Sequence, residues 1–134
     1  MTLKAFARML ARQVVHRGSF NCLITRDREL QDLNRRFREH DHATDILSFP
    51  AHDSDAALGD IAISLDRAEA QAREFGHSRL DEIRILMLHG VLHLAGMDHA
   101  RDNGAMAQAE QKWRSEFGLP CTLIARAEAA ALQK

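Results

Sequence analysis

Cysteine, proline and aromatic residues are scarce in this chain. Its 134 residues include two cysteines, two prolines and no tyrosine. Cys22 and Cys121 stand alone rather than in a CxxC pair, which argues against a disulfide framework or cysteine ligands to zinc and favours reduced, partly buried thiols. No apolar run is long enough to span a membrane, and the first residues lack the continuous apolar stretch of a signal peptide. We therefore expect a cytoplasmic protein with no membrane partner.

A charge excess of either sign is also absent, because the formal net charge is −1. That balance conceals an asymmetry, since residues 1–40 carry nine Lys/Arg against four Asp/Glu and residues 41–134 carry nine against fifteen. A guanidinium group can bind two phosphate oxygens at once, so an arginine cluster suits a nucleic acid. On charge alone, however, a solvated helix face is the favoured interpretation. Five arginines fall within thirteen residues: Arg26, Arg28, Arg35, Arg36 and Arg38.

Hydrophobic periodicity predicts a single α+β domain over residues 1–134, with a small mixed sheet of about four strands packed with five or six helices. The second expected helix has an apolar stripe of Leu30, Leu33 and Phe37, which we expect to be buried. Ser64 and Ser78 are suited to cap two later helices. The expected helices cover residues 3–14, 27–37, 64–76, 78–93, 106–117 and a peripheral 122–132; strands cover 20–25, 46–49 and 59–63; a loop covers 40–44 and a turn 53–55.

Residues 89–99 carry the most informative pattern, His-Gly-Val-Leu-His-Leu-Ala-Gly-Met-Asp-His. On a helix, His89 and His93 project from one face, one turn apart. Gly96 can end that helix in a left-handed conformation, so that the chain reverses and brings His99 toward the first two imidazoles. Three imidazoles with an open fourth position are typical of a catalytic zinc site, and the buried helix and the turn after it would hold one zinc ion per chain.

Gly90 separates this pattern from that of the zinc peptidases. Two histidines, a glycine and a third histidine follow the metzincin order, but the position after the first histidine holds a general-base glutamate in those enzymes. We therefore expect no peptidase activity. A bland interpretation, in which the histidines are only core residues, is disfavoured because histidines in so apolar a helix need partners that a metal ion would supply.

Several ordered motifs make the chain resemble the YbeY family of bacterial endoribonucleases. The histidine segment is the strongest match, and the others are Leu-Asn-Arg-Arg-Phe-Arg at 33–38, Thr-Asp-Ile-Leu-Ser-Phe-Pro at 44–50 and Leu-Gly-Asp-Ile at 58–61. Glu82 also stands at the expected place ahead of the first histidine. The resemblance covers about residues 20–118. Two departures are mild: Phe37 stands where tyrosine is usual and Met97 where an aromatic is usual, so neither position offers a hydroxyl.

The resemblance implies zinc held by His89, His93 and His99. It also implies cleavage of single-stranded RNA in ribosomal RNA maturation, at the 3′ end of the small-subunit RNA, and a role in ribosome quality control. From the family, Arg38 and His89 are the residues most expected to matter for activity. Two other functions stay open: a ribosome-assembly protein with mainly structural zinc, and a small metallohydrolase acting on a non-RNA substrate.

Elementary chemistry gives these residues distinct roles. A zinc ion polarises phosphoryl oxygens, and Arg38 is suited to hold the scissile phosphate and to stabilise charge that builds on its oxygens. Asp98, next to His99, is suited to orient an imidazole, and less so to act as a base for water. Asp45 and Asp60 can position loops around the site, although both can equally be turn or capping residues.

Overall fold

A mixed three-stranded sheet crosses the described part of the molecule, which in this computed structural model comprises residues 1–15, 18–38, 44–51, 57–99 and 101–132. The central strand β3 (Ala57–Ser64) pairs in parallel with β1 (Ser19–Thr25) and antiparallel with β2 (Ile46–Pro50). The α+β class is thus confirmed. Within those residues, the sheet has three strands instead of about four.

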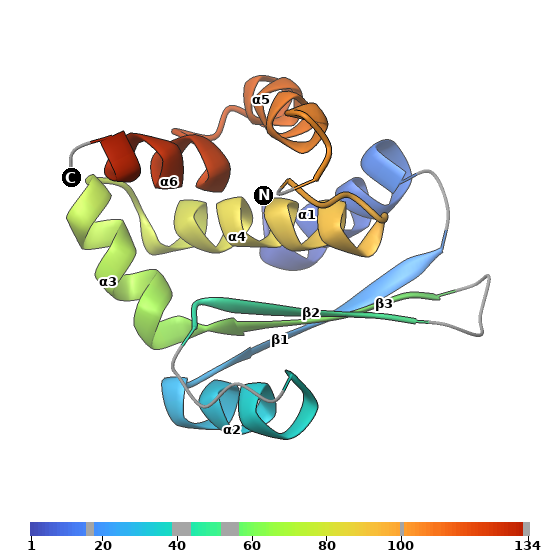
Figure 1. Ribbon diagram of the computed structural model, residues 1–134, viewed down its shortest axis with the longest axis vertical. Helices are drawn as coiled ribbons and strands as arrows, with labels where there is room; N and C mark the ends of the chain where they lie inside the picture. Colours follow the sequence, from blue (N-terminus) through green and yellow to red (C-terminus); the bar gives the residue numbers. More distant parts are fainter. Residues whose placement is uncertain (16–17, 39–43, 52–56, 100, 133–134) are drawn as a thin grey trace.

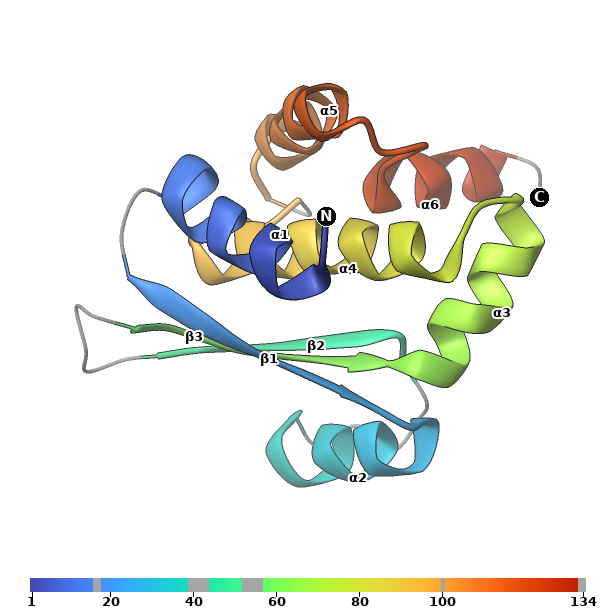
Figure 2. The same cartoon turned by 180° about the vertical axis from the view of Figure 1, so that it is seen from behind.

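The helices cover the two faces of the sheet unequally (Figures 1 and 2). Four of them, α1, α4, α5 and α6, lie on one side, α2 lies on the other, and α3 leaves one end of the sheet. A π-helical segment, η1, extends α1. The bounds are α1 Leu3–Met9, η1 Leu10–Val15, α2 Asp27–Arg38, α3 Leu65–Phe75, α4 Arg79–Leu94, α5 Ala105–Phe117 and α6 Leu123–Leu132.

Helix α4 is the centre of the main core. Ten of its sixteen residues are buried, because the sheet covers one side and neighbouring helices cover the others. Ile61 and Ile63 of β3 pack in this core, whereas Ala62 between them packs with Leu30 and Leu47 in a smaller core under α2. The alternation of side chains along a strand accounts for this division.

The predicted helix caps are present. The Ser64 hydroxyl accepts the backbone N–H of Arg67 at 3.2 Å, and the Ser78 hydroxyl accepts that of Asp81 at 3.0 Å. Gly76 ends α3 with a φ of 75°, a conformation that glycine adopts without a Cβ penalty. The Ser78 cap fixes where α4 begins, and therefore which of its residues face the sheet.

The stripe predicted for α2 is only partly buried. Leu30 is fully buried, but Phe37 is 65% exposed and contacts Phe49 edge-on, with ring centroids 6.0 Å apart. The sheet under α2 has only three described strands, so the last turn of the helix has little to pack against. Residues 40–43 of the expected loop and the turn at 53–55 lie outside the described residues.

The C-terminal helix α6 is not peripheral, contrary to our expectation. Ile124 is 2% exposed and belongs to the main core, and Leu123 packs against that core. Cys22 and Cys121 are free thiols of intermediate exposure, as predicted. None of the helices in the described ranges is long and apolar enough to cross a membrane.

Candidate metal centre

His89 and His93 lie side by side on α4, as their spacing predicts. Their rings meet edge-to-face with centroids 4.7 Å apart, and the two Nε2 atoms are 3.1 Å apart. Both side chains are partly buried at the edge of a cleft of about 380 Å³. The cleft is also lined by Leu123 of α6 and by residues 45–48 and 50, which belong to β2 or directly precede it.

Each histidine is bound through Nδ1 to an acceptor. Nδ1 of His89 lies 2.6 Å from Oε2 of Glu110, and Nδ1 of His93 lies 3.0 Å from the carbonyl oxygen of Met97. A carboxylate and a carbonyl can only accept, so each Nδ1 carries the hydrogen and donates it. When the rings are neutral, both Nε2 atoms then present lone pairs to each other, which is the arrangement that suits a shared cation.

The donor set fits zinc. Neutral imidazole nitrogens are common zinc ligands, and two of them at ligand distances of about 2.0–2.1 Å and a tetrahedral angle lie roughly 3.3 Å apart. The observed separation of 3.1 Å is close to that value. Burial lowers the pKa of His93, and the neighbouring His89 lowers it further; both effects favour the neutral form that binds metals.

The chain reverses after α4 as Gly96 predicts. Gly96 has a φ of 96°, and the backbone N–H of Met97 donates to the carbonyl of Leu92 at 3.1 Å. This turn places the Met97 carbonyl on His93. His99 follows on the turn with an exposed side chain. In the described ranges, no three His, Cys, Asp or Glu side chains are grouped to hold a metal ion, so His99 is not brought together with the other two histidines.

Gly90 lets α4 lie close to the sheet. A Cβ on this residue would lie 2.8 Å from Cδ1 of Ile46 and 3.0 Å from Cδ1 of Ile61. The missing side chain therefore has a packing reason in addition to its chemical consequence. It allows the helix that carries both histidines to approach β2 and β3.

Two carboxylates, one on α4 and one on α5, are buried, and the sequence patterns point to a role for neither. Glu110 is 1% exposed and bound to His89. Glu82 is fully buried and accepts two charge-assisted hydrogen bonds, of 2.8 and 2.7 Å, from the guanidinium of Arg126; its Oε1 also lies 2.7 Å from Nε2 of His77. Each is an acidic residue on an otherwise apolar helix face, the signal that could have identified it.

The Arg126 guanidinium also connects α6 to the rim of the cleft. Its NH2 group donates to Gln71 at 3.2 Å, and the amide of Gln71 donates to the carboxylate of Asp45 at 3.3 Å. Asp45 lines the histidine cleft. The segment before β2 is thus held by α3 and by the C-terminal helix.

The other predicted residues lie in different surroundings. Arg38 is the last residue of α2, and its side chain lies outside the described part of the structure. Asp98 is exposed and forms an ion pair with Arg101 at 3.7 Å. Asp60 accepts a hydrogen bond of 3.0 Å from the amide of Asn21 on the opposite face of the sheet from α4. Its proposed role at the histidine site is therefore not supported by its position.

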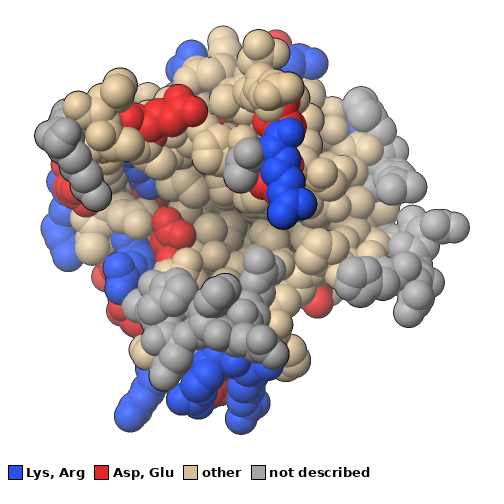
Figure 3. Space-filling model, viewed as in Figure 1, with Lys and Arg blue, Asp and Glu red and all other residues tan. Residues whose placement is uncertain are grey.

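The described side chains of the arginine cluster lie on an exposed surface, as the simpler interpretation predicts. Lys and Arg side chains gather over α2 at the lower end of the molecule in Figure 3. Arg35 and Arg36 are well exposed and both pair with Asp32, while Arg26 pairs with Asp66. Exposed pairs of this kind stabilise the fold little, so the guanidinium groups remain accessible to an anionic partner.

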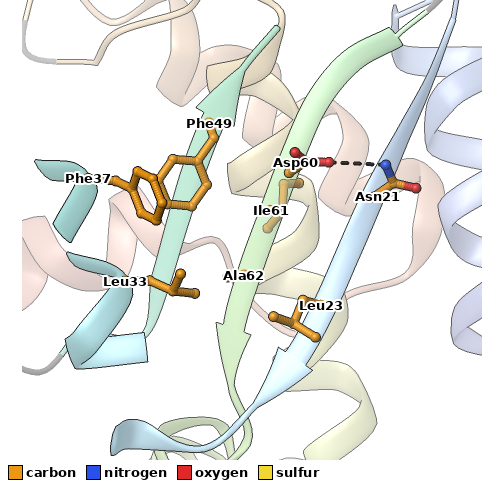
Figure 4. A pocket seen from close by; sticks show the side chains of 8 residues that line it. All are labelled: Asn21, Leu23, Leu33, Phe37, Phe49, Asp60, Ile61 and Ala62. Carbon is orange, nitrogen blue, oxygen red and sulfur yellow. Dashed lines mark hydrogen bonds between the residues drawn. The ribbon is translucent and has the colours of Figure 1, made fainter. Parts of the chain in front are cut away.

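A second cavity, of about 440 Å³, lies on the α2 side of the sheet. Its walls are largely apolar and include Leu23, Leu33, Phe37 and Phe49, with the hydrogen-bonded pair of Asn21 and Asp60 at one end (Figure 4). Among the described residues that line it there is no histidine, and Asp60 is the one titratable group. The histidine cleft is therefore the candidate for chemistry.

Comparisons with known proteins identify the family of the chain. The family model described as endoribonuclease YbeY matches residues 2–118. This chain belongs to the YbeY family. The match begins earlier than the core of about 20–118 inferred from the motifs, and it ends before α6.

Relatives of the YbeY family cover most of the chain. A protein of Solibacter usitatus named endoribonuclease YbeY is 56% identical over 126 residues, which are 94% of this chain and 84% of the relative. One of Koribacter versatilis with the same name is 56% identical over 110 residues, 82% of this chain and 72% of the relative. A solution structure of a Thermotoga maritima protein superposes with a TM-score of 0.60 at 29% identity, covering 85% of this chain and 83% of the other.

Proposed function

We propose that this chain is a zinc-dependent endoribonuclease that cleaves single-stranded RNA in ribosomal RNA maturation, at the 3′ end of the small-subunit RNA, and serves ribosome quality control. The observation that carries the metal assignment is the pair of facing Nε2 atoms on His89 and His93, each with its Nδ1 bound to an acceptor. The names of the relatives support RNA as the substrate. The arginine-rich surface of α2 offers a complementary charge for its phosphates.

The chain's own residues would bind and orient both metal and RNA. His89 and His93 would hold the zinc ion through Nε2, with His99 as the third ligand from the adjacent turn. When bound, zinc would polarise a phosphoryl oxygen of the RNA. Asp98 would orient an imidazole of the site. Leu123 and the residues that precede and form β2 would shape the walls around the RNA.

Arg38 would bind the scissile phosphate. Helix α2 ends at this residue, and the described chain resumes at Thr44, directly before the segment that lines the cleft. A guanidinium at the end of α2 would contact two oxygens of the phosphate and stabilise the charge that develops on them. Arg28, on the first turn of the same helix, would contribute only to general attraction of RNA.

The test combines metal analysis with RNA cleavage. The purified protein should contain close to one zinc ion per chain, and His93→Ala should remove most of it. Arg38→Ala should retain zinc and fold normally but cleave RNA about a hundredfold more slowly, the scale of a lost contact to a developing oxyanion. Arg38→Lys should recover only part of the rate, because an ammonium group cannot bind two oxygens in the same way.

Arg28→Ala is the matched control, since it removes an arginine from the same helix. It should weaken RNA binding and reduce its salt dependence while leaving the rate of cleavage of bound RNA unchanged. Full zinc content after replacement of both His89 and His93 would disprove the metal site. Cleavage by Arg38→Ala at the unmodified rate would disprove the role of Arg38. Weak RNA cleavage that zinc removal does not change would favour an assembly protein with mainly structural zinc.

A further inference from the structure

Glu110 uses both oxygens of a buried carboxylate. Oε2 contacts Nδ1 of His89 at 2.6 Å, and Oε1 accepts the backbone N–H of Ile124 at 3.1 Å. That N–H belongs to the first turn of α6, where no carbonyl of the helix itself can accept it. The carboxylate therefore joins the histidine helix to the start of the C-terminal helix.

We propose that Glu110 is a positioning residue that holds His89 in the tautomer with its hydrogen on Nδ1, so that a bare Nε2 faces His93. This inference rests on the proposed function, because Nε2 is the atom assigned to zinc. The tautomer of a metal-binding histidine is set by the hydrogen bond that its other ring nitrogen makes. Here that bond goes to a residue 21 positions away, in a different helix.

Because of its second contact, residue 110 must offer an accepting oxygen to each of its two partners, which a carboxylate can do and an amide cannot. The backbone N–H of Ile124 can only donate, so the oxygen facing it must accept. A glutamine at position 110 would have the same shape but only one oxygen. That oxygen would face Ile124, and the amide NH2 would face His89. Nδ1 would then accept, and the ring hydrogen would move to Nε2, where it would block the lone pair that points to His93.

The C-terminal helix thereby contributes to the histidine site, although it lies beyond the residues matched by the family model. Ile124 is 2% exposed, so its N–H has no access to water as an alternative acceptor. An unmade hydrogen bond at a buried donor is costly. The need to satisfy this donor fixes the orientation of residue 110, and through it the tautomer of His89.

The experiment measures the tautomer of His89 by NMR in chelator-treated protein labelled with ¹⁵N in the histidine rings. The unchanged protein should show hydrogen on Nδ1, and Glu110→Gln should show it on Nε2. Hydrogen on Nε2 in the unchanged protein would overturn the inference even without the variant. The same tautomer in both proteins would also overturn it.

Zinc titration gives a second readout. Glu110→Gln should bind zinc 10- to 100-fold more weakly, the usual effect of losing the partner of a ligating histidine. Glu116→Gln, the same change at an exposed position of α5, should leave both affinity and tautomer unchanged. Equal affinities for Glu110→Gln and the unchanged protein would contradict the positioning role. If the unchanged protein bound no zinc, the proposed function would fail, whereas the tautomer measurement would still decide this inference.

Discussion

The two faces of the sheet differ in how completely they are covered. On the α4 side, Ile61 and Ile63 of the central strand are sealed, with exposures of 1% and 0%. On the α2 side the same strand exposes Asp60, beside the exposed Leu23. The covered side holds His89, His93 and the buried carboxylates of Glu82 and Glu110, and the open side holds the arginine surface. Precise orientation of imidazoles therefore coincides with dense packing, while exposed charge is placed where side chains can move.

The two sides of the sheet should differ most in the stability that is lost when one carboxylate is removed from each side. Glu82→Ala would leave Arg126, whose side chain is only 9% exposed, without its buried partner, and should destabilise the fold by about 3–5 kcal/mol. Asp32→Ala, which removes the exposed partner of Arg35 and Arg36, should cost less than about 1 kcal/mol. Urea denaturation measures both. Similar losses in the two variants would mean that the sides are not energetically different.

Truncation of one apolar side chain on each side of the sheet should also give unequal losses of stability, with a smaller difference between the two sides. Leu86 is fully buried in the main core, so Leu86→Ala should lower the free energy of unfolding by about 2–5 kcal/mol. Phe37 is a larger residue but is 65% exposed, and Phe37→Ala should change the free energy of unfolding by no more than about 0.5–1 kcal/mol. Thermal unfolding of the two variants under the same conditions decides the matter. A larger loss for Phe37→Ala would show that the α2 side is more tightly packed than its exposure indicates.

The sequence predicts the covered side better than the open side. Helix α4 follows from its apolar run and from Ser78, and the pairing of His89 with His93 follows from helical spacing alone. The predicted burial of Phe37 is wrong because periodicity identifies an apolar stripe on a helix but does not show whether a sheet extends beneath all of it. The partner of His89 lies 21 residues away, in α5. Spacing within one helix carries no information about such a contact between helices.

The C-terminal helix shows the same limit of prediction from sequence, which does not reveal contacts between helices. Its alanine-rich composition predicts a helix but not its neighbours, so it gives no sign of the buried ion pair of Arg126 with Glu82. That pair spans 44 positions. His99 lies on the turn that Gly96 predicts, but the side chain is exposed. Its assignment as a zinc ligand therefore stays a prediction of the motif.

The close approach of α4 to the sheet can be tested with one methyl group. Gly90→Ala places a Cβ 2.8 Å from Cδ1 of Ile46 and should destabilise the fold by about 1–3 kcal/mol, despite the better helix propensity of alanine. Ile46→Val removes that Cδ1 and should recover part of the loss in the double variant. Denaturation of both single variants and the double variant gives the coupling energy. Strictly additive losses would mean that Ile46 is not what limits the approach of α4.

The smallest perturbation uses two neighbouring positions of β1 that point to opposite sides. Burial raises the pKa of the Cys22 thiol from 9.0 to about 11. Leu23, next to it, is 46% exposed on the other face. With Cys121→Ser in both proteins, Cys22 should react with a thiol reagent at pH 8 at least about a hundredfold more slowly than a cysteine introduced by Leu23→Cys in a Cys22→Ser background. Two pKa units account for a hundredfold difference in thiolate, the reactive form, and limited access adds to it.

Chelation of zinc should not accelerate labelling of Cys22 if the α4 side is held by packing rather than by metal. Equal labelling rates at the two positions would show instead that the α4 side opens as readily as the α2 side, and the contrast between the two faces would then be one of static exposure only.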